Sequence, residues 1–213
     1  MSSIIKRRLS WLFFLPPLFV FLGCQKKVSI PEYLKEVSHN PELRREYISG
    51  DYKITCTYIP PEVLAISELS NAEGSLSENS ILEEKERFSN GVYFNLRIGL
   101  TDSSDILKKG IVDRNQYVRR VNALTNDLRK AVFLIAGNGD TIKISNSIFE
   151  RSYGASPDAV FMVAFPKERL ENESAIKFIF DDKFFSIPNL VQFDFNLNYI
   201  DKELSSLKLN YEK

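Results

Sequence analysis

The chain has 213 residues, of which 44% are hydrophobic and 26% are charged. These proportions are typical of globular proteins and exclude a disordered or collagen-like chain. The 28 basic residues balance the 28 acidic ones, so the composition lacks the strongly basic character that nucleic-acid binding requires. The 16 Phe and 9 Tyr residues favour β-strands, in which aromatic side chains pack well.

The first 23 residues have the organisation of a secretory signal. Three basic residues at positions 6–8 precede an apolar run over 9–22. As a helix this run would span about 21 Å, whereas the hydrocarbon core of a bilayer is about 30 Å thick. Pro16 and Pro17 also disfavour a continuous helix. We therefore predict a cleaved signal peptide over residues 1–23, in preference to an uncleaved membrane span.

This segment ends in Phe21-Leu22-Gly23-Cys24, which resembles the lipobox of bacterial lipoproteins. Leu22-Gly23-Cys24 fits the pattern, and Phe21 stands where the family usually has Leu. The resemblance covers about 24 of the 213 residues. It implies cleavage before Cys24, a diacylglycerol thioether on its sulfur and usually a third acyl chain. The alternative is an ordinary signal peptide that ends in a coincidental cysteine.

Two features after the cysteine bear on location. Gln25 stands where an Asp would imply retention in the inner membrane of enteric-type bacteria. By the same resemblance, the lack of an acidic cluster after Cys24 favours the periplasmic side over the cell surface. We therefore expect a bacterial envelope protein that is lipid-anchored at the outer membrane and faces the periplasm.

Cys24 and Cys56 are the only cysteines. If lipid occupies the first, Cys56 has no partner within the chain, and the domain contains no disulfide. Alternation along residues 52–58 places Cys56 on one face with Tyr58, which predicts a small buried hydrophobic residue. A nucleophilic thiol would need a nearby base, and the only histidine is His39, in a polar stretch before this strand.

The first half of the chain after Cys24 combines short helices with two strands. We predict a lipidated tether over 24–30, short helical turns over 31–47, a strand over 51–59, a helix over 62–69, a loop over 70–80 and a brief helix over 81–88. The strand over 91–100 is the clearest of all, because every second residue from Val92 to Leu100 is apolar. One apolar and one mixed face are typical of an antiparallel sheet.

Residues 113–130 form the one convincing amphipathic helix. Tyr117, Val121, Leu124 and Leu128 recur at spacings of four, three and four, which places them in a single stripe. The polar residues around the stripe include both acidic and basic side chains. This mixture favours a helix that packs on a sheet over one that lies on a membrane surface.

The second half of the chain is a series of strands. We predict strands over 131–136, 159–165, 175–180, 184–187 and 190–199, with a hairpin at Asn138-Gly139. No βαβ alternation or fixed-period repeat occurs, and short turns join consecutive strands. The sequence therefore predicts a mainly β fold, an antiparallel β-sandwich with one packed amphipathic helix, as a single domain over 31–213.

The search for chemistry yields no catalytic, cofactor-binding or metal-binding residue. One histidine and one spare cysteine cannot form a usual zinc site, and the stretch from Asp102 to Asp105 lacks the glycine of a calcium loop. The adjacent carboxylates 181–182 and 83–84 are explained by a turn and by a solvated helix face. We therefore predict that the protein is not an enzyme and has no cofactor, and that its one site residue is the lipidated Cys24.

Four aromatic side chains lie off the predicted core faces: Tyr93, Tyr153, Phe185 and Tyr199. A contiguous patch of them would mark a partner or ligand site. The expected function is a membrane-tethered, non-catalytic interaction or structural component of the envelope, with a protein partner and no nucleic acid. The alternatives are a binding protein for an apolar or lipid-like ligand and an enzyme that acts on envelope polymers.

Overall fold

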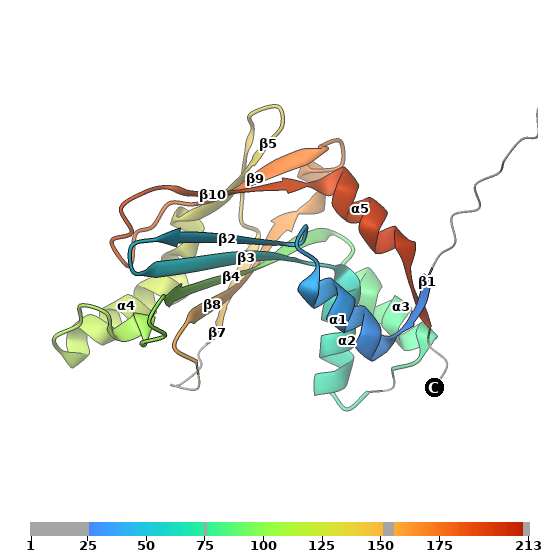
Figure 1. Cartoon of the computed structure of the whole chain (residues 1–213), viewed down its shortest axis with the longest axis horizontal. Coiled ribbons are helices and arrows are strands. Elements are labelled where there is room, and N and C mark those ends of the chain that lie inside the picture. Colours follow the sequence, from blue (N-terminus) through green and yellow to red (C-terminus); the bar gives the residue numbers. More distant parts are fainter. Residues whose placement is uncertain (1–25, 75, 151–155, 211–213) are drawn as a thin grey trace, which may run out of the picture.

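A computed structural model describes residues 26–74, 76–150 and 156–210 (Figure 1). These residues form a five-stranded sheet, a four-stranded sheet and a two-stranded sheet, together with five α-helices. The two larger sheets are antiparallel throughout. The mainly antiparallel β fold predicted from the sequence is therefore confirmed, with several helices around it.

The five-stranded sheet contains the best-predicted strand at its centre. Its order is β2 (Arg44–Ser49), β3 (Tyr52–Ile59), β4 (Gly91–Leu100), β8 (Ala159–Pro166) and β7 (Asn146–Glu150). Strand β4 covers the predicted range of 91–100, and the alternating residues Phe94, Leu96 and Ile98 are fully buried. The alternation marked the core face because successive side chains point to opposite sides of a strand.

The four-stranded sheet has the order β10 (Val191–Asn196), β9 (Ala175–Phe180), β5 (Val132–Ala136) and β6 (Thr141–Lys143). The predicted hairpin joins β5 to β6. Gly139 has a positive φ of 91°, and its amide closes the turn by donating to the Ala136 carbonyl at 2.9 Å. Directly after β6 the chain crosses to the other sheet, where the Ser145 amide donates to the Ala164 carbonyl.

Phenylalanine rings fill the space between the two larger sheets. The Phe94 ring from β4 lies 5.2 Å from the Phe178 ring of β9 and 5.1 Å from the Phe195 ring of β10, centroid to centroid. Phe165 of β8 also contacts Phe178, at 6.0 Å. Such ring pairs contribute roughly 0.5–1.5 kcal/mol each beyond the burial of their surface. The sheets therefore form a sandwich with an aromatic core.

Arg45 connects the edge strands of the two sheets. Its Nε donates to the Asp194 carbonyl of β10 at 3.0 Å, and its guanidinium lies 5.3 Å from the centroid of the Phe195 ring. Another nitrogen donates to the Glu42 carboxylate at 3.0 Å. One arginine thus holds β2 beside β10 at this edge of the sandwich.

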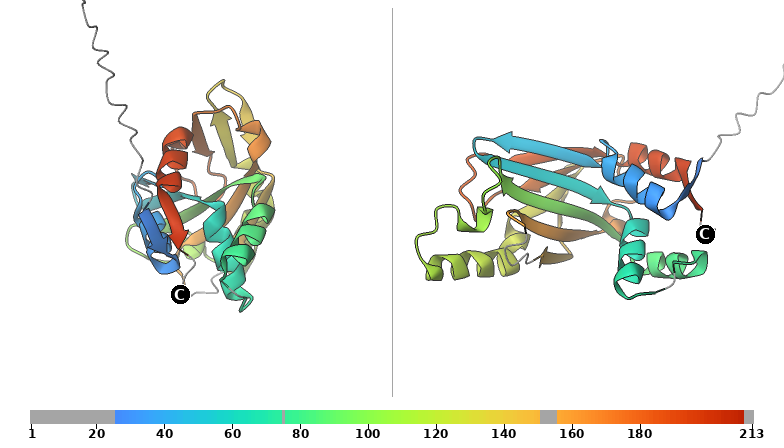
Figure 2. Two further views of the ribbon diagram at one scale, coloured as in Figure 1. Left: turned by 90° about the vertical axis from the view of Figure 1, so that its right-hand side faces the viewer. Right: turned by 60° about the horizontal axis from the view of Figure 1, so that its bottom comes forward.

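Four helices gather at one end of the sandwich, where the first and last described strands also meet (Figures 1 and 2). The helices are α1 (Ile30–His39), α2 (Pro61–Asn71), α3 (Glu78–Arg87) and α5 (Leu197–Ser206). Strand β1 (Lys26–Ser29) pairs in parallel with β11 (Leu207–Asn210). Both strands bury one apolar side chain, Val28 and Leu209 respectively. We call this part of the molecule the helical end.

The predicted amphipathic helix lies at the opposite end (Figures 1 and 2). It comprises α4 (Arg114–Asp127), continued by the 3-10 turn η2 (Leu128–Lys130) and preceded by η1 (Ile106–Lys108). A third 3-10 turn, η3 (Lys167–Arg169), follows β8. Of the predicted stripe, Leu124 and Leu128 are buried, while Tyr117 and Val121 are half-buried. The first turns of α4 thus lie further from the core than its last turns, and we call this region the distal tip.

Four sequence-based expectations for local structure were wrong in whole or in part. The tether predicted over 24–30 is instead strand β1 and the start of α1 from residue 26 onward. Helical turns were predicted over 31–47, but the chain enters β2 at Arg44. The strand predicted over 184–187 is a loop, and the strand predicted over 190–199 ends at Asn196, whose side chain caps α5.

Candidate functional site

The predicted lipidation residue Cys24 and the signal peptide over 1–23 lie outside the described residues. The described element closest in sequence is β1, which begins at Lys26. Cys24 precedes the start of β1 by two residues in the sequence. A lipid on Cys24 would therefore be attached beside the helical end of the molecule.

Cys56 and His39 do not form a catalytic pair. Cys56 is fully buried in β3, as the alternation predicted, and burial raises the pKa of its thiol well above the ordinary value. His39 ends α1 at the surface, with Nδ1 2.8 Å from the Lys35 carbonyl oxygen. A thiol that is buried and protonated is a poor nucleophile, because the thiolate is the reactive form.

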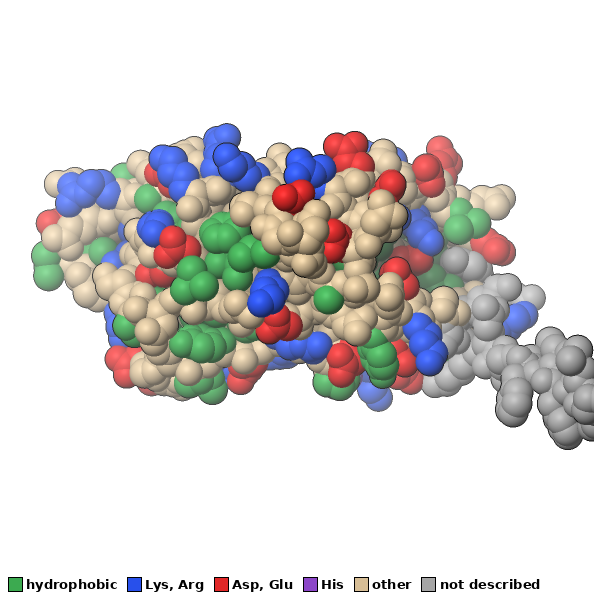
Figure 3. All heavy atoms as spheres, turned by 90° about the horizontal axis from the view of Figure 1, so that it is seen from above, with side chains coloured by type: hydrophobic (Ala, Val, Ile, Leu, Met, Phe, Trp, Pro, Cys, Tyr) green, Lys and Arg blue, Asp and Glu red, His purple; other side chains and the backbone are tan. Residues whose placement is uncertain are grey.

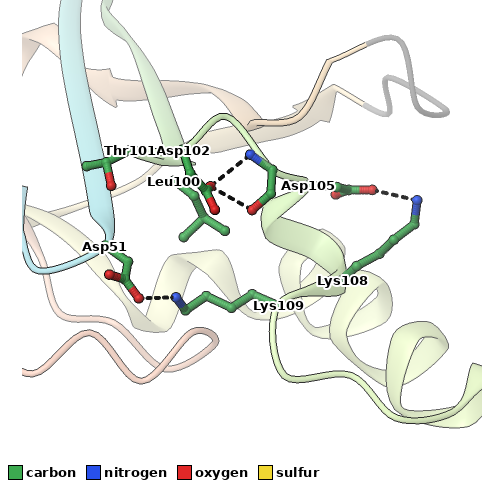
Figure 4. A pocket seen from close by; sticks show the side chains of 8 residues that line it. Asp51, Leu100, Thr101, Asp102, Asp105, Lys108 and Lys109 are labelled. Carbon is green, nitrogen blue, oxygen red and sulfur yellow. Dashed lines mark hydrogen bonds and ion pairs between the residues drawn. The ribbon is translucent and has the colours of Figure 1, made fainter.

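One pocket lies at the distal tip, between the β2–β3 turn and the segment that leads into η1 (Figure 4). Its volume is about 420 Å³, and three carboxylates and two lysines line it. Asp51 Oδ2 accepts from Lys109 Nζ at 2.8 Å, and Asp105 Oδ2 pairs with Lys108 Nζ at 3.1 Å. Asp102 Oδ1 accepts from the Ser104 amide and hydroxyl at 2.9 and 2.7 Å.

These carboxylates have structural partners in place of catalytic ones. Asp105 also caps η1 by accepting from the Leu107 amide at 2.9 Å. The amide and hydroxyl of Ser104 lower the pKa of Asp102, which is opposite to the shift that a general acid needs. In the described part of the chain, no three His, Cys, Asp or Glu side chains are grouped so that they could hold a metal ion.

The adjacent acidic pairs from the sequence also have local roles. Asp182 accepts the backbone amides of Phe184, Phe185 and Ile187 at 2.8–3.1 Å, and so shapes the loop after β9. Asp181 pairs with Lys183 across the same turn. On α3, Glu84 pairs with Arg87 at 2.7 Å. The first pair therefore belongs to a turn, as predicted.

Of the four aromatic side chains expected off the core, the three that the structure describes differ in how deeply they are buried. Phe185 is buried at 5% exposure, so this expectation was wrong, because the Asp182 loop turns its ring inward beneath Arg120. Tyr93 is half-buried against Phe88, whereas Tyr199 is 42% exposed on α5. Tyr153 lies outside the described residues.

A groove of about 520 Å³ opens at the helical end, between α5, the start of α2 and the segment after η3. Glu62, Glu171, Glu173 and Asp201 contribute carboxylates to it. Glu62 pairs with Lys85 at 2.6 Å, and Glu173 accepts from the Gly137 amide at 2.7 Å. Burial, together with the nearby carboxylates of Asp201 and Glu62, raises the pKa of Tyr58, which therefore remains a neutral phenol.

A further pocket of about 510 Å³ has the most apolar lining of those described here. It lies where β5, β9 and β10 meet Arg45, and its apolar side chains are Ile135, Ala136, Ala175, Ile176 and Phe195. It is an open hollow at the edge of the sandwich. The surface on the side of β9 and β10 mixes charges of both signs around a group of apolar side chains (Figure 3).

Arg120 connects α4 to the rest of the distal tip. One guanidinium nitrogen donates to the carbonyls of Ile106, Leu107 and Lys109 at 3.4, 3.1 and 2.7 Å. Its charge lies 5.5 Å from the centroid of the Phe185 ring. Burial lowers the pKa of this guanidinium below its ordinary value. Arg120 lies off the apolar stripe of the helix, and no local pattern predicts this role, because the carbonyls that it binds belong to a separate segment of the chain.

Charge separates the two ends of the molecule. The four helices of the helical end carry ten acidic and four basic residues: Glu32, Glu36, Glu62, Glu68, Glu78, Glu83, Glu84, Glu86, Asp201 and Glu203 against Lys35, Lys85, Arg87 and Lys202. Residues 106–130 of the distal tip carry seven basic and two acidic residues: Lys108, Lys109, Arg114, Arg119, Arg120, Arg129 and Lys130 against Asp113 and Asp127. A chain that is neutral overall therefore carries acidic helices at one end and a basic segment, 106–130, at the other.

Comparisons with family models, curated proteins and solved structures found no match to this chain. Among the helices of the described residues, none has both the length and the apolar character that crossing a bilayer would take.

Proposed function

We propose that the protein is a bacterial envelope lipoprotein, anchored by lipid on Cys24, that acts as a non-catalytic interaction or structural component. The observation that carries this proposal is the place of the lipobox-like sequence directly before the fold. Leu22-Gly23-Cys24 ends two residues before β1, and every described helix and strand follows it. Cleavage before Cys24 would leave all these elements intact.

The anchor that we propose would be effectively permanent. A single myristoyl chain binds a membrane with a K of only about 10⁴ M⁻¹, at roughly 0.8 kcal/mol per buried CH₂. Two or three acyl chains on one residue make dissociation negligible. Because Cys24 precedes β1 so closely, the helical end would lie next to the bilayer. We place the protein at the outer membrane on the basis of Gln25, and facing the periplasm on the basis of the lack of an acidic cluster after Cys24.

The non-catalytic role is supported by the use of the polar side chains. At the distal pocket the carboxylates of Asp51, Asp102 and Asp105 are engaged by lysines, a serine and a helix amide. The buried side chains of the described residues leave no polar atom without a hydrogen-bond partner. Active sites commonly retain an unpaired group for the reaction, whereas each of these three carboxylates has a hydrogen-bond or ion-pair partner.

The alternative, a binding protein for an apolar ligand, has one site in its favour. The phenylalanine rings occupy the space between the sheets, so a ligand would have to bind in the open pocket beside Phe195. Such a pocket would bury only part of a lipid-like molecule, whereas ligand sites usually bury 70–90% of their ligand. The interaction role is therefore the better supported of the two.

The test of the anchor is intact-mass analysis of the protein purified from the membranes of the cells that make it. The proposal expects a chain that begins at Cys24 and carries diacylglycerol with or without a third acyl chain. Cys24→Ser should remain unlipidated and leave the membrane fraction, whereas the matched control Cys56→Ala should behave like the wild type. A chain that begins elsewhere, or a free thiol on Cys24, would contradict the proposal.

The interaction role has its own test. Affinity purification of the detergent-solubilised, lipidated protein should recover the same envelope protein in repeated preparations, at a fixed ratio. Preparations that reproducibly contain this chain alone would count against the interaction role and leave the anchor untouched.

A further inference from the structure

The outward face of α4 is basic and contains no acidic side chain. Among the described residues of 114–129, the exposed ones are three arginines, three asparagines, one threonine and one valine, namely Arg114, Arg119, Arg129, Asn115, Asn122, Asn126, Thr125 and Val118. They lie on one side of the helix, because residues three and four apart share a face. We call these eight residues the α4 outer face.

The two acidic residues near this face, Asp113 and Asp127, interact with residues outside it. Asp113 is the N-cap of α4 and accepts from the Gln116 amide at 2.8 Å, and Asp127 pairs with Lys130 at 2.7 Å. Within the described part of the chain, no ion pair or hydrogen bond engages the side chains of Arg114, Arg119 and Arg129. The sequence suggested a polar face of mixed sign. In the structure Asp113 precedes the helix and Asp127 is half-buried, so neither belongs to the α4 outer face.

The α4 outer face is also rigidly positioned. Arg120 fastens the middle of the helix to three carbonyls of the segment 106–109, and Leu124 and Leu128 bury the last turns. A surface that is ordered before binding loses little conformational entropy when a partner docks. Charged residues on a fixed helix can therefore act as a preorganised docking surface.

Apolar side chains accompany the arginines. Val118 within the face is 44% exposed, and Val112, just before the helix, is 84% exposed. Protein interfaces are enriched in arginine and contain apolar contacts, whereas binding of a simple polyanion depends on charge alone. The combination of free arginines, amide side chains and exposed valines favours a protein partner.

We infer that the α4 outer face is a docking surface for an acidic surface of a second protein. This inference rests on the proposed function, since it names the interaction site of the tethered domain. The distal tip lies at the end of the molecule opposite to β1, and so opposite to the proposed lipid (Figures 1 and 2). It would therefore point away from the anchoring bilayer, toward the compartment where another protein can reach it.

The inference is tested by photo-cross-linking of the full chain in the cells that make it. Val118→p-benzoylphenylalanine places the reactive group within the face, and Leu82→p-benzoylphenylalanine places it at an exposed position of α3 as a control. The cross-linked peptide is identified by mass spectrometry. We expect an adduct from position 118, absent at position 82, with a protein segment of net negative charge.

Charge variants in the cross-linking strain decide between docking and accidental contact. Arg114→Glu/Arg119→Glu/Arg129→Glu should reduce the adduct at least about tenfold, because it sets like charges against the partner. Lys35→Glu/Lys177→Glu/Lys202→Glu, which makes the same charge change at exposed sites outside α4, should leave the adduct within about twofold. A third variant with Gln at the three arginines keeps the test valid if the Glu variant unfolds.

The inference is overturned if position 118 yields no protein adduct, or an adduct with lipid or glycan only. It is also overturned if the attached segment is not acidic, or if the adduct survives both arginine variants while they remain folded. Membrane fractionation of the same cells reports on the Cys24 anchor. In the chain with all three arginines intact, absence of the adduct from protein that is still membrane-bound refutes docking alone. Release of that chain from the membrane with the adduct retained refutes the anchor alone.

Discussion

The two ends of the molecule differ in secondary structure, in charge and in the way they are held. At the helical end, four acidic helices surround a parallel pair formed by the first and last described strands. At the distal tip, one basic helix is attached through its last two turns and through Arg120. The helical end is thus secured by many backbone pairings, and the tip by a few side chains.

The difference shows how a neutral chain can present two chemically distinct surfaces. Phenylalanine rings fill the core of the sandwich between the ends, and this core stabilises both ends. Its rigidity allows charges of opposite sign to be kept apart, beyond the distance of about 8 Å at which salt screens them under physiological conditions. Each of the following predictions tests whether the ends are independent or share one core.

The largest effect is expected from Phe94→Ala, in the centre of the sandwich. Phe94 is fully buried and contacts Phe165, Phe178 and Phe195. Loss of the ring should lower the free energy of unfolding by about 3–5 kcal/mol. Urea unfolding followed at both ends by hydrogen exchange should show one transition at a lower midpoint. Separate transitions for the two ends would mean that they do not share one core.

The next largest effect is expected from Arg120→Met, which keeps the length of the side chain and removes its donors. Three carbonyls of residues 106–109 lose a charged partner, which we expect to cost about 1–3 kcal/mol. The loss should be local, with faster hydrogen exchange in α4 and unchanged exchange in α1 and α5. Its neighbour Arg119→Met, on the outer face, should change stability by less than about 0.5 kcal/mol. Equal effects of the two variants would contradict the inference that Arg120 anchors α4.

A smaller loss of stability, local to the helical end, is expected from Val28→Ala in β1. Val28 is 1% exposed and lies opposite Leu209 in the parallel pair. Removal of two methyl groups should cost about 1–2 kcal/mol. Exchange should quicken in β1, β11 and α5, and the distal tip should keep its protection. Protection lost first at α4 would contradict the division of the molecule into two separately held ends.

The smallest effect is expected from alkaline pH acting on Cys56 in the shared core. Burial raises the pKa of this thiol above its ordinary value of 9.0, so the unfolded chain releases the proton first as pH rises. The stability that the neutral thiol contributes is complete below pH 9 and declines above it, at no more than about 1.4 kcal/mol per pH unit. Thermal unfolding between pH 8 and 9.5 should show this decline for the wild type. Cys56→Ala should lack the thiol's share of it, and an identical pH slope in the two proteins would contradict the prediction.

Local patterns in the sequence determined the elements whose burial is regular. Strand β4 follows from its alternation, α4 from its apolar stripe and the β5–β6 hairpin from Asn138-Gly139. In each case the cause lies within a few residues, because side-chain period and turn geometry are local properties. The same reasoning led from Leu22-Gly23-Cys24 to the proposed lipid anchor.

Tertiary structure alone decided the features that depend on distant partners. Strand β2 has no apolar alternation and exists because β3 pairs with it and Arg45 connects it to β10. The loop over 184–187 resembles a strand in sequence. Its amides donate to the Asp182 carboxylate, so they are not available to pair with another strand. The basic α4 outer face could not be foreseen either, because its limits depend on which residues of the helix the neighbouring segments bury. Hydrogen-bond partners far apart in sequence leave no local periodicity, and this is why only the folded chain reveals them.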